Sequence, residues 1–229
     1  MISKNIFEVE QRIQQACQRS NRDRKEVTLI AVSKTKPVEL IREAIAAHMT
    51  DFGENKVQEL CAKMEQIQEP VRWHMIGHLQ RNKVKSIVGQ VACIHSVDSV
   101  PLAEQISQEA KKKQVQCDIL VEINIAKEAT KFGILPEETE NFLRKIAIFP
   151  NIRVRGFMTV APFTESAEEN RIYFRQMKQL AVDISAKNID NMTIDMLSMG
   201  MTGDYEVAIE EGATHIRVGT GIFGERNYH

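Results

Sequence analysis

The stretch VTLIAVSKTKP, Val27 to Pro37, is a run of β-branched and aliphatic residues that ends in two lysines and a proline. A continuous apolar run of this kind is typical of a strand buried on both faces in a parallel sheet. The residues that follow such a strand emerge at the rim of the sheet, and Lys34 is among them. The stretch therefore predicts a parallel α/β fold that presents a lysine where its first strand ends.

Further apolar runs follow along the chain, and segments of helical period separate them. The predicted strands cover residues 27–33, 50–53, 72–77, 92–97, 117–124, 152–160, 195–199 and 214–219. Strands that alternate with helices indicate crossover units in a parallel sheet. Eight such pairs in 229 residues predict a single (β/α)8 barrel of the TIM type, one domain over residues 1–229, with an extra amphipathic helix at the N-terminus.

Composition argues against several classes of function. The formal net charge is -1, and Lys and Arg form no uncompensated cluster of the kind that binds nucleic acid or an anionic membrane surface. The first 20 residues lack the apolar core of a signal peptide, and no apolar run is long enough to cross a bilayer. The four cysteines form no CxxC pair, which predicts free thiols. We therefore expect a cytoplasmic protein.

Two glycine-rich segments, LSMGMTGD and RVGTGIFGE, continue from the last two predicted strands. The corresponding loops of a (β/α)8 barrel frequently hold phosphate, because glycine lets backbone N–H groups approach an anion and a following helix presents its positive end. A helix is expected to begin after Gly203. The glycines could instead only turn the chain, but their joint placement favours a phosphate cradle.

Several segments taken together resemble the pyridoxal phosphate homeostasis proteins, also called the YggS or PROSC family. These segments are AVSKTKP, FGENKVQE, WHMIGHLQRNK, RGFMTVAP and LSMGMTGDYEVAIEEGATHIRVGTGIFG. The resemblance implies a fold type III barrel similar to the N-terminal domain of bacterial alanine racemase, without that enzyme's second β-domain. It also implies binding of pyridoxal 5'-phosphate (PLP) without an established catalytic activity.

The resemblance also implies roles for particular residues. Lys34 would form a Schiff base with the PLP aldehyde, Arg217 would face the pyridine nitrogen, and Ser198, Gly219 and Thr220 would bind the phosphate, while Asn55 and Met158 would lie against the ring. His78, just past the third predicted strand, is a candidate for the pocket wall, and Asn124 and Lys131 either reach the mouth or serve their own loop.

The chemistry of these residues fits the implied roles. A Schiff base requires an uncharged amine, whereas a solvated lysine with a pKa of ~10.4 is charged at neutral pH. Burial at the barrel mouth and a nearby cation such as Arg217 would favour the neutral form of Lys34. A charged Arg217 at the pyridine nitrogen would leave that nitrogen unprotonated and the ring a poor electron sink. Lys36 is expected to be turned elsewhere at Pro37.

Two other functions stay open on the sequence. A PLP-dependent amino acid racemase of weak or unknown specificity would need a second base, which related racemases take as a tyrosine from the extra domain and a partner subunit. Here Tyr173 and Tyr205 fall in helical segments and Tyr228 falls in the tail. A barrel enzyme that binds a phosphorylated sugar would use the same loops and Lys34.

The expected partners are PLP and PLP-dependent apoenzymes, with no nucleic acid and no membrane. We expect a monomer, because the racemase domain that helps to form a dimer is missing from the pattern. No metal is expected, because His74 and His78 lack helical spacing and a third ligand. His74, beside Trp73, is expected to be structural.

Overall fold

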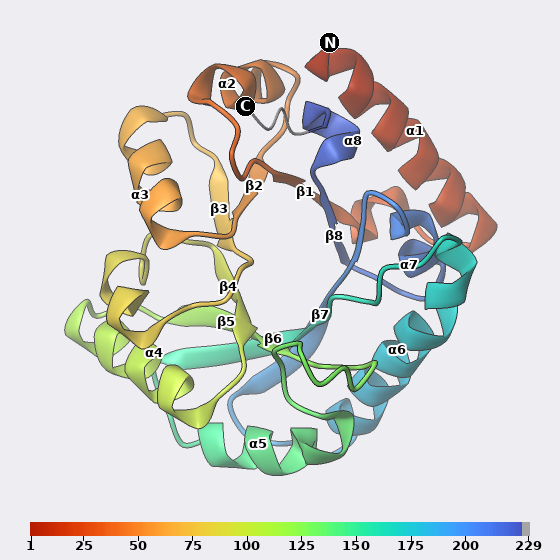
Figure 1. Cartoon of the computed structure of the whole chain (residues 1–229). Helices are drawn as coiled ribbons and strands as arrows, with labels where there is room; N and C mark the ends of the chain where they lie inside the picture. The colour runs from red at the N-terminus through yellow and green to blue at the C-terminus, as the bar shows by residue number, and fades with distance from the viewer. Residues whose placement is uncertain (226–229) are drawn as a thin grey trace.

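A computed structural model describes residues 1–225 of the chain. Eight parallel strands close into a barrel in sequence order, and β8 pairs with β1 to complete it. Helices surround the barrel on its outside (Figure 1). The predicted (β/α)8 architecture and the extra N-terminal helix are confirmed.

All eight predicted strands are present, with small shifts at their ends. They are β1 (Thr28–Val32), β2 (Asp51–Glu54), β3 (Arg72–Met75), β4 (Cys93–Val97), β5 (Cys117–Glu122), β6 (Ile152–Met158), β7 (Met192–Met201) and β8 (His215–Val218). The largest difference is at β7, which was predicted over 195–199 only. Its first half is only partly buried and carries the exposed Thr193 and Asp195, so it lacks the apolar run by which a buried strand is recognised.

Helices of very different length connect the strands. The α-helices are α1 (Ile2–Arg19), α2 (Val38–Ala46), α3 (Val57–Gln66), α4 (Val100–Lys112), α5 (Thr139–Ile146), α6 (Arg171–Ser185), α7 (Tyr205–Glu210) and α8 (Thr220–Phe223). Shorter 3-10 segments are η1 (Arg24–Glu26), η2 (Arg81–Ser86), η3 (Pro136–Glu138) and η4 (Ala167–Asn170). The helix expected after Gly203 is α7.

Helix α1 covers the side of the barrel where the regular helices are shortest. It packs against α7, α8 and α2 (Figure 1), and it buries Ile2, Ile6, Val9 and Ile13 on one face. The four residues of α8 are too few to cover the neighbouring strands, so α1 supplies apolar surface there. Among the described residues, no helix has the length and apolar character needed to cross a membrane.

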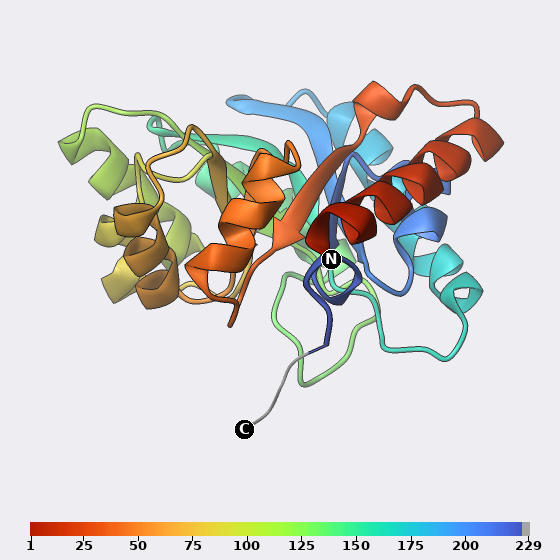
Figure 2. The same cartoon turned by 90° about the horizontal axis from the view of Figure 1, so that it is seen from above.

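The carboxyl ends of the strands open on one face of the barrel. The loops that follow β5 and β6 project from this face, and α8 lies on it as well (Figure 2). Because active groups of (β/α)8 proteins lie at this face, we expect the predicted site residues to lie there.

Candidate functional site

Lys34 lies in a tight turn directly after β1 and is partly buried. The N–H of Lys36 donates to the carbonyl oxygen of Ser33 at 3.0 Å, which closes the turn. Thr35 adopts a positive φ of 64° in it, and its N–H donates to the Glu59 carboxylate at 2.5 Å. The side chain of the acid thus holds an unfavourable backbone conformation beside Lys34.

Lys36 is directed away from this turn. Its ammonium donates to the carbonyl oxygens of Phe223 and Gly224, both at 3.1 Å, at the end of α8. The prediction that the chain turns Lys36 elsewhere is confirmed, and Lys36 instead ties the β1–α2 turn to α8.

A buried ionic cluster supports the Lys34 turn from below. The Ser33 hydroxyl donates to Glu54 Oε1 at 2.6 Å, and the Lys63 ammonium donates to the same oxygen at 2.7 Å. Lys63 also donates to the Ser33 carbonyl oxygen at 2.7 Å and to Glu59 at 2.6 Å. Burial raises the pKa of Glu54, and the hydrogen bonds from Lys63 and Ser33 oppose that rise. This cluster was not predicted from the sequence.

Arg217 of β8 lies inside the barrel with 4% of its surface exposed. Its Nη1 donates to Ser198 Oγ at 2.6 Å, and its Nη2 donates to the carbonyl oxygen of Thr159 at 2.8 Å. Burial lowers the pKa of Arg217 to about 10, while the charges of Asp204 and Glu122 oppose the shift. The guanidinium therefore stays charged at neutral pH, as its predicted role requires.

Ser198 is fully buried between Arg217 and His95. Its Oγ lies 2.9 Å from His95 Nδ1 as well as 2.6 Å from the Arg217 guanidinium. The hydroxyl accepts from Arg217, and whether it donates to His95 depends on the tautomer of that ring. The phosphate contact implied for Ser198 stays a prediction.

The loops after β7 and β8 lie against each other, as the phosphate cradle requires. Thr202 Oγ1 accepts from the N–H of Gly219 at 3.3 Å and from the N–H of Gly221 at 3.4 Å. Gly219 is partly buried, and Thr220, the first residue of α8, is exposed. The two loops therefore form one continuous stretch of backbone at the rim.

Gly200 near the end of β7 and Gly219 after β8 differ in what an added Cβ would meet. Gly200 has a φ of 91°, and a Cβ there would lie 2.6 Å from the Cβ of Ala208, so packing against α7 requires glycine. A Cβ on Gly219 would instead make an ordinary contact of 3.5 Å with Val32. Packing therefore explains Gly200 but not Gly219, which leaves the Gly219 backbone a candidate for contact with a ligand.

The two residues implied to lie against a ring come from opposite sides of the barrel, after β2 and at the end of β6. Asn55 follows β2 directly and is partly buried, and a Cβ on Gly77 would come within 2.4 Å of its carbonyl oxygen. Met158 ends β6 and is buried against Cys93 and Leu120 in a small apolar cluster inside the barrel. Glycine at position 77 thus lets the β2 and β3 ends approach closely.

His78 lies at the rim and not in the interior. Its side chain is 40% exposed, its Nδ1 lies 3.5 Å from Asp98 Oδ2, and its ring stacks on Phe132 with centroids 4.0 Å apart. The Asn124 side chain bonds the backbone of Glu128 in its own loop. His78 therefore belongs to the edge of the mouth, and Asn124 has the loop role that the sequence left open.

His74 is buried and joins a polar group that the sequence did not reveal. Its Nε2 lies 3.0 Å from Asp51 Oδ1, and its Nδ1 lies 3.0 Å from His95 Nε2. His215 lies close by, with its ring centroid 6.4 Å from those of His74 and of His95. Within residues 1–225 no group of three or more His, Cys, Asp or Glu side chains is arranged to hold a metal ion.

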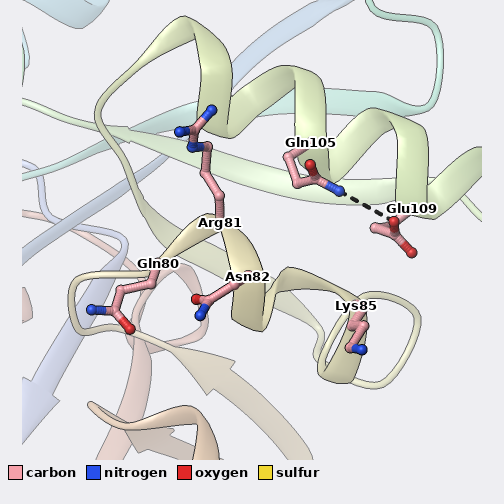
Figure 3. A pocket seen from close by; sticks show the side chains of 6 residues that line it. All are labelled: Gln80, Arg81, Asn82, Lys85, Gln105 and Glu109. Atoms are coloured by element: carbon pink, nitrogen blue, oxygen red, sulfur yellow. Dashed lines mark hydrogen bonds between the residues drawn. The ribbon is translucent and has the colours of Figure 1, made fainter.

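A separate hollow of the surface lies between η2 and α4 (Figure 3). It has a volume of about 700 Å³ and is open and polar, with Arg81 and Lys85 on one side and Gln105 bonded to Glu109 on the other. None of its lining residues is a predicted site residue. We therefore place the candidate site at the barrel mouth, where the predicted residues meet.

Comparison with known proteins identifies the family. Residues 5–227 match the family model described as alanine racemase, N-terminal domain. The "Pyridoxal phosphate homeostasis protein" of Aquifex aeolicus is 42% identical over 224 residues, which cover 97% of each chain. The protein of the same name from Escherichia coli is 37% identical and covers 99% of this chain and 97% of that one. The chain belongs to the pyridoxal phosphate homeostasis family.

Solved structures agree with this assignment. PipY of Synechococcus elongatus, solved with PLP bound, is 34% identical with a TM-score of 0.85, and the match covers 98% of this chain and 100% of PipY. A Bifidobacterium adolescentis protein of unknown function gives a TM-score of 0.92 at 33% identity, covering 97% of this chain and 94% of that one. An alanine racemase from Clostridium difficile shares the fold alone, with a TM-score of 0.75 at 13% identity, and the match covers 99% of this chain and 57% of the racemase.

Proposed function

We propose that this protein binds PLP at the mouth of its barrel, holds it as a Schiff base on Lys34 and serves PLP homeostasis. The names of the relatives and the PLP bound to PipY support the choice of ligand. In the bond proposed, the Lys34 amine condenses with the PLP aldehyde to a carbon–nitrogen double bond and releases water. The cofactor supplies a reactive aldehyde, and the protein supplies the groups that hold it.

The pairing of β1 with β8 is the observation that carries this proposal. Ile30 pairs with Arg217 and Ala31 with Val218, so the two strands end side by side. Lys34 therefore leaves β1 next to the Gly219–Thr220 loop, and Arg217 lies one layer deeper on the same pair of strands. An amine, a candidate phosphate loop and a fixed cation thus lie in the order that a PLP molecule would require.

The chemistry of Arg217 favours a protein that holds PLP over an enzyme that uses PLP for catalysis. A permanently charged guanidinium opposite the pyridine nitrogen cannot readily accept its proton, so carbanions would gain little stabilisation from the ring. The racemase alternative gains no support from the tyrosines. Tyr205 lies in α7 and is buried, and Tyr173 lies in α6, as predicted, while Tyr228 lies outside the described residues.

Absorption spectroscopy tests the proposed Schiff base. Addition of PLP to the purified protein should produce the visible band of a PLP imine, and Lys34→Ala should abolish the band. Lys36→Ala is the matched control, because Lys36 belongs to the same turn but binds the α8 carbonyls. A band that survives in Lys34→Ala but disappears in Lys36→Ala would place the Schiff base on Lys36 and contradict the proposal.

We further propose that the protein is a cytoplasmic monomer and that PLP-dependent apoenzymes are the recipients of its cofactor. The PLP-loaded protein should then restore activity to a PLP-free transaminase faster than the Lys34→Ala protein does. Equal rates for both proteins would argue against delivery. Sedimentation of the loaded protein tests the monomer.

A further inference from the structure

A continuous chain of buried hydrogen bonds crosses the barrel interior beneath the candidate site. Arg217 Nη1 donates to Ser198 Oγ at 2.6 Å, and Ser198 Oγ lies 2.9 Å from His95 Nδ1. His95 Nε2 lies 3.0 Å from His74 Nδ1, and His74 Nε2 lies 3.0 Å from Asp51 Oδ1. None of the five residues is more than 4% exposed. Barrels of this class usually fill this space with branched apolar side chains, so a polar chain here needs an explanation.

The chemistry of its two ends gives the chain one direction. A guanidinium can only donate, and a carboxylate can only accept. With both imidazoles neutral, His74 donates from Nε2 to Asp51 and accepts at Nδ1 from His95 Nε2. His95 then accepts at Nδ1 from the Ser198 hydroxyl, and Ser198 accepts from Arg217. Each bond has one donor and one acceptor, and every donor points from Arg217 towards Asp51.

The surroundings keep the middle of this chain neutral. Burial lowers the pKa of His95 well below its ordinary value, and the charge of Arg217 acts in the same direction. Burial likewise lowers the pKa of His215 to about 4, so this third ring adds no positive charge near neutral pH. A neutral His95 can accept from Ser198 only at an unprotonated Nδ1.

The far end of the chain is a fixed negative charge. Burial alone would raise the pKa of Asp51, but hydrogen bonds from His74, Arg72 and Thr50 outweigh it and hold that pKa well below its ordinary value. Arg72 donates to both carboxylate oxygens, at 2.8 and 2.6 Å. Asp51 therefore stays ionised and accepts from His74 Nε2. With a neutral His74, this bond fixes the tautomer of each ring in turn.

We propose that Asp51, His74 and His95 are positioning residues that, through Ser198, hold the Arg217 guanidinium opposite the pyridine nitrogen of PLP. The hydrogen-bond chain directs the Ser198 hydroxyl proton away from Arg217, so that a lone pair of the Ser198 oxygen faces the guanidinium. The Thr159 carbonyl fixes the second nitrogen of the fork. The location of the ligand rests on the proposed function, whereas the direction of the chain rests only on the hydrogen-bond geometry.

Nitrogen-15 NMR of the histidine rings tests the direction of the chain in PLP-free protein near neutral pH. His74 and His95 should both be neutral and protonated at Nε2, with Nδ1 unprotonated. A His95 protonated at Nδ1, or a doubly protonated His74, would reverse the chain and overturn the proposal. This measurement needs no cofactor, and glutamine substitutions serve only to assign the signals.

Variants of His95 test the link to the cofactor. His95→Phe removes the donor and the acceptor, and we expect about tenfold weaker PLP binding, equal to ~1.4 kcal/mol, with a shifted absorption band of bound PLP. His95→Gln keeps one donor and one acceptor and should restore most of the affinity and the band. A glutamine variant that behaves like His95→Phe in both measurements would contradict the positioning role.

His215→Phe is the matched control for a general loss of packing. His215 is partly buried in the same interior, but its Nδ1 bonds Thr214 Oγ1 at 2.8 Å and it is not part of the hydrogen-bond chain. We expect its replacement to leave PLP affinity and the band unchanged. An equal loss of PLP affinity in His215→Phe and His95→Phe would mean that the hydrogen-bond chain serves only to stabilise the core. Failure of the wild-type protein to bind PLP would refute the proposed function and leave the NMR test intact.

Discussion

Glu122, at the end of β5, has the ionisation behaviour most directly open to measurement. Burial raises the pKa of Glu122 to about 7, with a further rise from the charge of Asp98 and an opposing effect of Arg217. The carboxyl of an unfolded chain has a pKa of ~4.3. The folded protein therefore binds more protons than the unfolded chain between these values, and Glu122 makes the fold less stable as pH rises through that window.

Glu122→Gln should remove this effect. We expect the variant to be more stable than wild type above neutral pH, by on the order of 2 kcal/mol, and to approach wild-type stability near pH ~4. Urea unfolding at several pH values measures the difference. A variant whose stability advantage does not change with pH would show that Glu122 titrates normally.

At the residue scale, the sequence predicted the charge of a site residue better than the hydrogen-bond partners of its neighbours. Arg217 was predicted to be a fixed cation in the site, and it is buried and charged. His95 was not predicted at all, because alternation along ACIHSV shows that Cys93 and His95 share a face but does not say which face. The phosphate role of Ser198 is implied by the family resemblance, which does not show that Arg217 and His95 lie within hydrogen-bond distance of its hydroxyl.

At the scale of elements, the β1–α2 turn depends on a charge cluster that lies outside the barrel wall. Lys63 follows Val57 and Leu60 at helical spacing and is buried with them on one face of α3. A lysine inside an otherwise apolar stripe is a signal that sequence reading could have used. Lys63 lies 2.7 Å from Glu54 Oε1, so each of these buried charges depends on the other.

Lys63→Met tests this cluster. Removal of the cation leaves the buried Glu54 carboxylate uncompensated, and we expect a loss of ~3 kcal/mol in the free energy of unfolding. The double variant Lys63→Met with Glu54→Gln should recover part of the loss, because no buried charge remains. Thermal or urea unfolding of both proteins decides the point. A single variant as stable as wild type would mean that Glu54 is protonated in the native protein.

The loops after β7 and β8 offer a matched pair of glycine substitutions. Gly200→Ala should lower stability by ~2 kcal/mol or more, because its φ of 91° is strained for alanine and its Cβ would meet Ala208 at 2.6 Å. Gly219→Ala should leave stability within ~0.5 kcal/mol but weaken PLP binding, because its Cβ makes ordinary protein contacts and would crowd the proposed phosphate. Unfolding and PLP titration of both variants measure this. Unchanged PLP affinity in Gly219→Ala would remove that loop from the site.

Strands and helices could be predicted from the sequence wherever their buried residues form a regular apolar pattern. Strands buried along their length, such as β1 and β4, were predicted almost to the residue. Strand β7 was predicted too short, because Thr193 and Asp195 interrupt the apolar pattern on its exposed first half. The helix that covers the short α8 could be predicted as amphipathic, but the place where α1 packs depends on the closure of the barrel.

At the scale of the whole molecule, two histidines of the barrel strands set how stability responds to acid. His95 and His215 have pKa values below that of a solvated histidine, so the unfolded chain binds their protons first as pH falls. The stability that these neutral rings contribute is fully present above pH ~6.5 and is lost as pH falls towards ~4. Glu122 acts with the opposite sign over part of this range and masks the loss in the wild-type protein.

The Glu122→Gln protein should therefore show the histidine effect alone. We expect its free energy of unfolding to fall between pH ~6.5 and ~4, by up to ~1.4 kcal/mol per pH unit for each histidine. Adding His215→Phe should reduce the slope by about one histidine's share. A slope that does not change on removal of His215 would show that this ring is not held neutral.

Closure of the barrel brings the first and last strands together, and the account of function depends on that junction. Borohydride reduction of the PLP-treated protein, followed by intact mass and peptide mapping, measures it most directly, because reduction turns the imine into a stable secondary amine. We predict one added PLP group per chain, located on Lys34. Modification spread over surface lysines, with Lys34 unmodified, would contradict the account.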